Sequence, residues 1–243
     1  MKKNSAWLIV ASFFFVTALS PASAQTSKDV LAKMIDAQGG AKALGAVKDQ
    51  SMVGNLEMVQ MGLKGVLTLS TKEPNMMRLD MEIMGMLISQ AFDGEKARMT
   101  NPQTGSVEEM PDNLTQEIRR QALGFDSLLN PEKHGITFEF KGKEKIQETD
   151  YLVLDEKLPD GHIITYYLDP STFLAYKTKT LGLSQTGAEA MIEMLSTDYQ
   201  KVEGVMVPMT ITQIQDGQQF MRITVTKVSF NSNLDDTFFK LAK

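Results

Sequence analysis

The sequence predicts an α+β protein built on one large, strongly curved antiparallel sheet of about a dozen strands, with helices covering its concave side. Three observations lead to this prediction. Short segments with period-two hydrophobicity recur through most of the chain after residue 50. Hairpin-type dipeptides, among them Asp93-Gly94, Asp160-Gly161 and Asp216-Gly217, separate several of these segments. Helical spacing is confined to two regions, near the start and the middle of the chain.

The first 24 residues have the organisation of a secretory signal peptide. Lys2 and Lys3 precede an apolar run over 6–16, and Ala22-Ser23-Ala24 supplies small residues at both positions that determine cleavage. We expect cleavage after Ala24, which leaves 25–243 as a single domain; a retained N-terminal anchor is the alternative. Because no later stretch approaches the roughly 20 apolar residues of a spanning helix, we expect no stable membrane span after cleavage.

Composition excludes several classes of protein. The 243-residue chain has no cysteine, which rules out disulfides, thiolate metal sites and a cysteine nucleophile. Its formal net charge is −5, and this balance does not supply the basic surface that a nucleic-acid binder needs. The sequence therefore predicts an acidic exported protein with no nucleic-acid partner.

Two segments predict helices. Apolar residues recur at helical spacing in both: Val30, Met34 and Ala37 in the first, and Leu114, Ile118 and Ala122 in the second. The first helix is expected over 29–38 behind Ser27 as N-cap and ends at Gly39-Gly40, with a further short turn over 41–47. The second helix, of about three turns, is expected to stop at Gly124.

The clearest predicted strand covers 76–84. Its residues alternate between an apolar face of Met77, Leu79, Met81 and Ile83 and a polar face of Arg78, Asp80 and Glu82. This alternation is typical of an antiparallel sheet with one buried and one solvated face. The other predicted strands cover 51–60, 64–71, 86–92, 96–100, 136–142, 149–156, 162–169, 173–181, 193–202, 206–215 and 219–230.

Methionine is the most unusual component of the sequence. The chain has 17 methionines, and nine of them lie within residues 52–99. They could simply pack a hydrophobic core. Flexible thioether side chains also suit the deformable wall of a cavity for a lipid-like ligand. Strand alternation does not separate these two interpretations, because a filled core and an open pocket present the same inward-facing side chains.

Motifs for catalysis are missing from the sequence. There is no G-x-S-x-G, H-E-x-x-H or P-loop motif. His134 and His162 follow turn residues, so we expect both to be solvated hairpin residues, and neither has the paired spacing of metal ligands. We therefore expect no catalytic residue, no metal site and no cofactor. An enzyme acting on lipids remains a further class, which turnover dependent on a single carboxylate would support.

Several short motifs together indicate a known family. They are Lys72-Glu73-Pro74-Asn75-Met76-Met77-Arg78, then Ala91-Phe92-Asp93-Gly94, and then Asn101-Pro102. This run resembles the "K-x-P-x-x-x-R … DG … P" signature of the LolA-like outer-membrane lipoprotein-sorting protein superfamily, and the remainder resembles a less characterised branch of that superfamily. The similarity extends over essentially all of the chain after residue 24.

The resemblance implies an incomplete, half-open β-barrel with a lid of helices around an apolar cavity. In that superfamily the cavity accepts the acyl chains of lipoproteins or similar lipids. The resemblance also implies transport partners in the inner and outer membranes and, together with the signal peptide, a periplasmic location. Pro74, Arg78, Asp93 and Gly94 match the signature. Among these only Arg78 has a side chain that we expect to contact a lid or cargo.

We therefore predict a periplasmic carrier without catalytic activity that binds lipid or lipoprotein acyl chains and moves them toward the outer membrane. The residues predicted to face its cavity are Met77, Leu79, Met81, Ile83, Ile211, Ile223 and Val225. An acyl chain in water must hide its surface, at about 0.8 kcal/mol per methylene, so such a carrier needs an apolar site. The alternative is a ligand-sensing or envelope-assembly scaffold that engages a protein partner through the same sheet.

Overall fold

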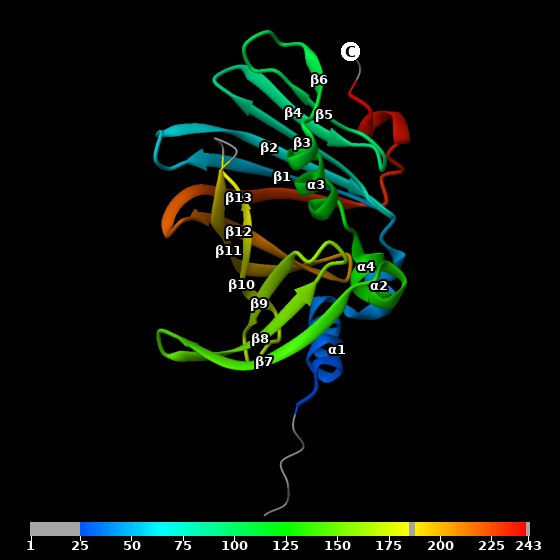
Figure 1. Ribbon diagram of the computed structural model, residues 1–243, viewed down its shortest axis with the longest axis vertical. Helices are drawn as coiled ribbons and strands as arrows, with labels where there is room; N and C mark the ends of the chain where they lie inside the picture. Colours follow the sequence, from blue (N-terminus) through cyan, green and yellow to red (C-terminus); the bar gives the residue numbers. More distant parts are fainter. Residues whose placement is uncertain (1–24, 185–187, 242–243) are drawn as a thin grey trace, which may run out of the picture.

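The computed structural model describes residues 25–184 and 188–241, and these residues form a single antiparallel sheet with a few helices on one face (Figure 1). The predicted α+β fold class is confirmed. The predicted signal peptide, residues 1–24, lies outside the described residues, so its cleavage stays a prediction, as does the single-domain boundary at residue 25.

Thirteen strands make up the sheet in the described part of the chain. They are β1 (Asp49–Met58), β2 (Leu63–Lys72), β3 (Met76–Ile83), β4 (Met86–Phe92), β5 (Ala97–Thr100), β6 (Val107–Glu109), β7 (Thr137–Ile146), β8 (Thr149–Lys157), β9 (Ile163–Leu168), β10 (Ala175–Leu183), β11 (Glu189–Val202), β12 (Val205–Gln215) and β13 (Gln218–Phe230). Their order is β6-β5-β4-β3-β2-β1-β13-β12-β11-β10-β9-β8-β7. Because β6 and β7 are the two edges of this order, the sheet is curved but not closed into a barrel.

The pairing of β1 with β13 joins the two halves of the sheet. Every other neighbouring pair in the sheet consists of consecutive strands, whereas β1 and β13 come from opposite ends of the chain. Leu56 of β1 lies opposite Ile223 of β13, and the register shifts between Val53 and Gly54. A β-bulge of this kind increases the local twist and bends the strand, which helps the sheet to curve.

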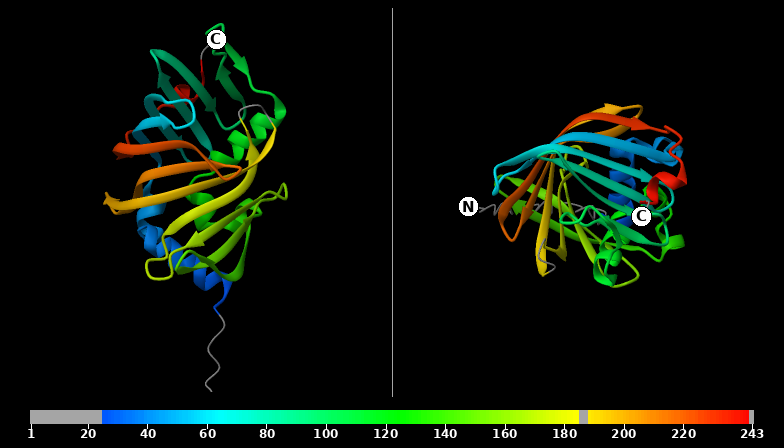
Figure 2. Two further views of the ribbon diagram at one scale, coloured as in Figure 1. Left: turned by 90° about the vertical axis from the view of Figure 1, so that its left-hand side faces the viewer. Right: turned by 90° about the horizontal axis from the view of Figure 1, so that it is seen from above.

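The helices are α1 (Ser27–Gln38), α2 (Gly40–Ala46), α3 (Asp112–Gln121), α4 (Phe125–Leu129), and two 3-10 helices, η1 (Pro131–His134) and η2 (Asp236–Phe239). The α-helices lie inside the curve of the sheet, as the view from above in Figure 2 shows, whereas η2 lies against the opposite face, where Arg78 bonds to Phe238. Helix α1 packs against β7, β8 and β12, and α3 packs against β4, β5 and β10. No helix in the described part of the chain combines the length and the apolar character that crossing a bilayer requires.

Local sequence explains where α1 begins and ends. Thr26 is its N-cap: the Thr26 hydroxyl accepts the Asp29 amide at 3.2 Å, and the Asp29 carboxylate accepts the Thr26 amide at 3.1 Å. Gly39 ends the helix with a φ of 132°, and a Cβ there would lie 2.4 Å from the Gly204 carbonyl oxygen. The predicted helix is therefore present, with its cap one residue earlier than Ser27.

Two apolar clusters fix the helices on the sheet. Val30 and Met34 of α1 are fully buried against Leu152, Leu154 and Leu168. On the other half of the sheet, the residues around α3 form a second cluster with members Met77, Phe92, Ala97, Met110, Ile118 and Ala122. All but Ala37 of the apolar residues that predicted the two main helices thus belong to the clusters that attach these helices to the sheet.

Sequence periodicity found most strands and missed the short elements. All twelve predicted strands are present within a few residues of their expected bounds. It missed β6, α4, η1 and η2, because segments of three to five residues are too short to show a period. It also ended one strand at residue 142, whereas β7 continues to Ile146 through a bulge near Gly142.

Candidate functional site

An apolar surface made only of strand residues occupies the middle of the sheet, and we call it the concave apolar patch. Its buried members are Leu56, Met58, Leu67, Ile83, Ile223 and Val225. Its partly buried members are Met52, Leu63, Leu69, Leu79, Met81, Met209, Ile211, Phe220, Met221 and Val228. These residues lie on β1, β2, β3, β12 and β13, which are neighbours in the sheet.

The patch lies on the same face of the sheet as the helices. Leu79, Met81 and Ile83 share one face of β3 with Met77, which packs against Ile118 of α3. The clusters beneath α1, α2 and α3 each include helix residues, whereas the patch includes none among the described residues. The patch is therefore the part of this face that no helix residue joins, and ten of its side chains keep partial contact with solvent.

Most of the residues predicted to face a cavity meet in this patch. Leu79, Met81, Ile83, Ile211, Ile223 and Val225 all belong to it. Met77 does not; it is buried in the neighbouring cluster beneath α3, and Leu79 packs against both clusters. The structure thus brings six of the seven predicted residues together on one apolar surface. Their role in ligand binding stays a prediction.

Arg78 lies on the opposite face of β3. Its Nε donates to the Asp80 carboxylate at 2.8 Å, and its Nη1 donates to the Phe238 carbonyl oxygen at 2.9 Å. The guanidinium also lies 4.6 Å from the centroid of the Phe238 ring. In this structure Arg78 therefore fixes the C-terminal segment around η2 to the sheet. Its predicted contact with a lid or cargo stays a prediction.

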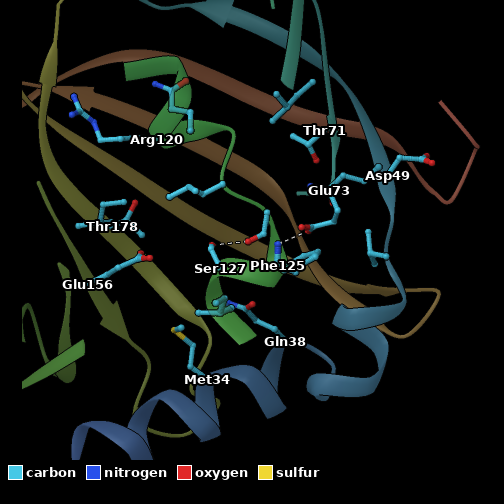
Figure 3. Close-up of a pocket in the computed structure, with 18 of the residues that line it drawn as sticks. Met34, Gln38, Asp49, Thr71, Glu73, Arg120, Phe125, Ser127, Glu156 and Thr178 are labelled. Carbon is cyan, nitrogen blue, oxygen red and sulfur yellow. Dashed lines mark hydrogen bonds between the residues drawn. The ribbon is translucent and has the colours of Figure 1, made fainter. Parts of the chain in front are cut away.

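A cavity of about 440 Å³ lies beside the patch, between the helices and the sheet (Figure 3). This size is within the range of small-molecule sites, roughly 300–1,000 Å³. Its lining is mixed. Apolar side chains come from Met34, Val47, Leu69, Leu123, Phe125, Leu128 and Ile164, and polar ones from Gln38, Lys48, Asp49, Gln50, Thr71, Glu73, Arg120, Gln121, Ser127, Glu156, Tyr166 and Thr178.

Glu73 projects from the end of β2 to the start of α4. Its Oε1 accepts the Phe125 amide at 2.6 Å, and its Oε2 accepts the Asp126 amide at 3.4 Å. Burial raises the pKa of Glu73 above its ordinary value, while these two backbone donors oppose the rise. Gly124 makes this approach possible, because a Cβ there would lie 2.2 Å from Glu73 Oε1.

A second carboxyl group faces the cavity from β8. Glu156 is 6% exposed, and its Oε2 accepts the Tyr166 hydroxyl at 2.7 Å. Burial raises the pKa of Glu156, and the hydrogen bond from Tyr166 opposes the rise. Burial likewise raises the pKa of Tyr166 well above its usual range. The cavity therefore contains two carboxyl groups, from distant parts of the chain, that burial makes harder to ionise.

Both histidines are partly buried and bonded rather than solvated. His162 Nε2 lies 2.7 Å from Thr180 Oγ1, and burial lowers the pKa of this imidazole. His134 Nε2 lies 2.9 Å from Asp126 Oδ2, which connects η1 to α4. The expectation of solvated hairpin residues is thus too simple. Turn dipeptides locate a hairpin, but they do not show which helix packs beside it.

Within residues 25–184 and 188–241, no group of three or more histidine, aspartate and glutamate side chains is placed to hold a metal ion. The patch and the cavity meet at Leu69, which belongs to the patch and lines the cavity. Together they offer a half-buried apolar surface that ends beside carboxyl, hydroxyl and amide groups. This arrangement suits a ligand with a long apolar part and a polar end.

Sequence reasoning did not locate this mixed cavity, and it missed ten of the 16 residues of the patch. Alternation along β1 and β2 could have added four residues to the predicted surface. Leu56 and Met58 share a face of β1, and Leu67 and Leu69 share a face of β2. No comparable signal identifies Glu73 or Glu156. Their shared cavity arises from the packing of α1, α4 and the curved sheet.

Comparison with known proteins identifies the fold. No family model matches the chain, and no curated protein matches its sequence. Among solved structures, the chain is similar to a LolA superfamily protein from Nitrosomonas europaea, with a TM-score of 0.59 and 13% identity over 88% of this chain and 97% of the other. It is also similar to a DUF1329 family protein from Desulfovibrio piger, with a TM-score of 0.59 and 9% identity over 88% and 97% of the two chains.

A third structure supports the same conclusion. It is a domain assigned to outer membrane lipoprotein sorting from Vibrio parahaemolyticus, with a TM-score of 0.56 and 13% identity over 87% of this chain and 94% of the other. These likenesses extend over nearly the whole of each neighbour and concern the fold. The fold that the sequence motifs suggested is thus confirmed: the chain has an open, curved sheet, and it shares its fold with a LolA superfamily protein and a lipoprotein-sorting domain.

Proposed function

We propose that the protein is a periplasmic carrier that binds the acyl chains of lipoproteins or other lipids on the concave apolar patch and moves them toward the outer membrane. One observation carries this proposal: the patch is a continuous apolar surface inside the curve of the sheet, and no helix residue joins it among the described residues. A folded protein normally covers such a surface, so an uncovered one is typical of a binding site.

The side chains of the patch suit reversible binding. Met52, Met58, Met81, Met209 and Met221 all belong to it, and unbranched thioether side chains adapt to ligands of different shape. Burial of an acyl chain yields about 0.8 kcal/mol per methylene. A soft surface that keeps partial contact with water can therefore hold a chain and still release it.

The polar cavity gives the proposal a place for the other end of the ligand. Tyr166 lines it, and Ser127 and Thr178 line it together with the carboxyl groups of Glu73 and Glu156 (Figure 3). Ester and headgroup atoms require hydrogen-bonding partners when they leave water. We therefore propose that the acyl chains lie on the patch and that the polar end of the ligand points into the cavity.

The test is uptake of a fluorescent fatty acid by the purified protein and by a Met81→Glu variant. A carboxylate at Met81 would have to lose its hydration against the bound chain, so we expect uptake to fall at least tenfold. Leu181→Glu is the matched control. It adds the same charge at a residue that is 48% exposed on β10, and its uptake should equal that of the wild type.

A folded Met81→Glu protein with unchanged uptake would contradict the assignment of the patch. The material that accompanies the protein during gentle purification separates the two classes of function. Bound lipid or acylated peptide, identified by native mass spectrometry and extraction, supports the carrier. A reproducible polypeptide partner together with a lipid-free protein would favour the envelope-assembly scaffold.

A further inference from the structure

Two neighbouring hairpin tips carry five of the eight exposed large apolar side chains of the described residues, including the three most exposed. The β1–β2 tip (residues 58–63) includes Val59 and Met61, which are 41% and 48% exposed. The β3–β4 tip (residues 83–88) includes Met84, Met86 and Leu87, which are 76%, 53% and 57% exposed. Neither tip contains a charged residue.

The two tips lie at the same end of the sheet. Their hairpins are joined through β2, where Leu63 pairs with Met58 on one side and Gly65 pairs with Ile83 on the other. Several other turns in the described chain are polar: 101–106, Asp160-Gly161, Glu203-Gly204 and Asp216-Gly217. The apolar character is therefore a property of these two adjacent tips and not of hairpin turns in general.

Methionine is an unusual residue at position 84, given the backbone conformation of the turn. Met84 and Gly85 have φ values of 54° and 77°, so both central positions of this two-residue turn are left-handed. Asparagine or aspartate is the usual residue at the first of these positions, because most L residues adopt positive φ only with strain. A methionine that is three-quarters exposed in such a position serves neither the turn nor the core. Strained backbone of this kind is often associated with function.

The tips are continuous with the concave apolar patch. Met58, Leu63 and Ile83 belong both to the tips and to the patch. An apolar path therefore runs from the exposed ends of the hairpins into the curve of the sheet. The nearest charged pair, Lys64 and Glu57, is 3.9 Å apart, so these two charges offset each other beside the tips.

We propose that the two tips are a docking surface for a zwitterionic phospholipid bilayer, into whose interface Met61, Met84 and Met86 insert. The proposal rests on the proposed function, because a carrier must load or unload its acyl chain at a membrane. Protein interfaces have a polar rim and about one hydrogen bond per 100–200 Å², whereas these tips present apolar side chains with no charged group. Shallow insertion of a few apolar side chains gives the weak, reversible contact that a carrier needs.

Flotation with phosphatidylcholine vesicles tests the proposal. The wild-type protein should float with the vesicles, in low and in high salt alike, because the contact is apolar. A triple variant, Met61→Gln, Met84→Asn and Met86→Thr, should bind the vesicles at least tenfold more weakly, since each methionine loses its transfer to the apolar phase. Asparagine suits the left-handed position, so this variant should fold at least as well as the wild type.

The matched control removes apolar side chains elsewhere. Ile163→Ser with Leu181→Ser changes two residues of similar exposure, 42% and 48%, on β9 and β10, and should float like the wild type. A wild-type protein that stays unbound, or a triple variant that floats equally well, would overturn the proposal.

Fatty-acid uptake without vesicles separates this proposal from the proposed function. If the triple variant takes up fatty acid normally but does not float, both the docking surface and the carrier are supported. If the wild type floats through the tips but takes up no fatty acid, the docking surface stands and the carrier fails. If the triple variant is folded and loses both activities, the tips belong to the ligand site itself and the separate docking surface is overturned.

Discussion

The inner face of the sheet has two apolar regions that differ in whether helix residues cover them. Beneath α1, residues of β8 and β9 are covered by the helix, and Leu154 and Leu168 are fully buried. Across β1, β2, β3, β12 and β13, the concave apolar patch has no helix residue, and Met81 and Ile211 stay partly exposed. The covered region stabilises the fold. The patch retains apolar surface that the fold itself does not use.

The strongest test of this difference is to truncate one side chain in each region and compare the losses of stability. Leu154→Ala should lower the free energy of unfolding by about 3 kcal/mol, because the helix prevents the site from collapsing around the cavity. Met81→Ala should cost about 1 kcal/mol, because this side chain already contacts solvent and leaves no closed cavity. Urea denaturation measures both values. Equal losses would mean that the patch is an ordinary core.

The next prediction concerns the contact that holds α4 over the cavity. Gly124→Ala places a Cβ where Glu73 Oε1 now lies, so Glu73 must leave the Phe125 and Asp126 amides. Loss of these charge-assisted hydrogen bonds should lower stability by about 2 kcal/mol. Gly124 has φ −92° and ψ −170°, which alanine adopts without strain, so the contact with Glu73 decides the outcome.

Gly45→Ala is the matched control for that substitution. Gly45 lies in α2, and a Cβ there would meet Leu129 Cδ1 at an ordinary 3.5 Å. Alanine should therefore raise stability by about 0.5–1 kcal/mol through its helix propensity. A Gly124→Ala protein as stable as this control would show that Glu73 does not hold α4 in place.

These two regions also show how far sequence reasoning reaches. Alternation along β3 placed Met77, Leu79, Met81 and Ile83 on one face and Arg78 on the other, because the side-chain period of a strand is fixed by its backbone. Alternation does not say which inward residues a helix covers. The different surroundings of Met77 and Met81 depend on where α3 packs, which no local pattern encodes.

The polar cavity could not be predicted from the sequence either, because it also depends on how distant elements pack together. Glu73 lies just after β2 and Glu156 lies on β8, in opposite halves of the strand order, and the two line one cavity only because the sheet curves. The motif around Lys72 to Arg78 predicted the fold, which the solved structures share. The capping of α4 by the carboxylate of Glu73 within that motif becomes visible only in the folded chain.

The smallest change in stability is expected for Glu156→Gln, because the Tyr166 hydroxyl can still donate a hydrogen bond to the amide oxygen of the glutamine. Burial raises the pKa of Glu156 in the folded protein above its value in the unfolded chain. The folded state therefore holds this proton more tightly, and the stability that Glu156 contributes at low pH is lost as pH rises through the folded pKa. A glutamine side chain does not titrate, so the variant should gain stability relative to the wild type as pH rises from about 4 toward 7.

Urea denaturation of both proteins across this pH range measures that gain. Tyr166→Phe sharpens the test, because it removes the hydroxyl donor that opposes the rise in the pKa of Glu156. The dependence of stability on pH should then be steeper than in the wild type. A constant difference between Glu156→Gln and the wild type would mean that the Glu156 carboxyl is as well solvated in the folded protein as in the unfolded chain. The helix-covered region would then be open to water, and the contrast with the concave apolar patch would be one of composition rather than of burial.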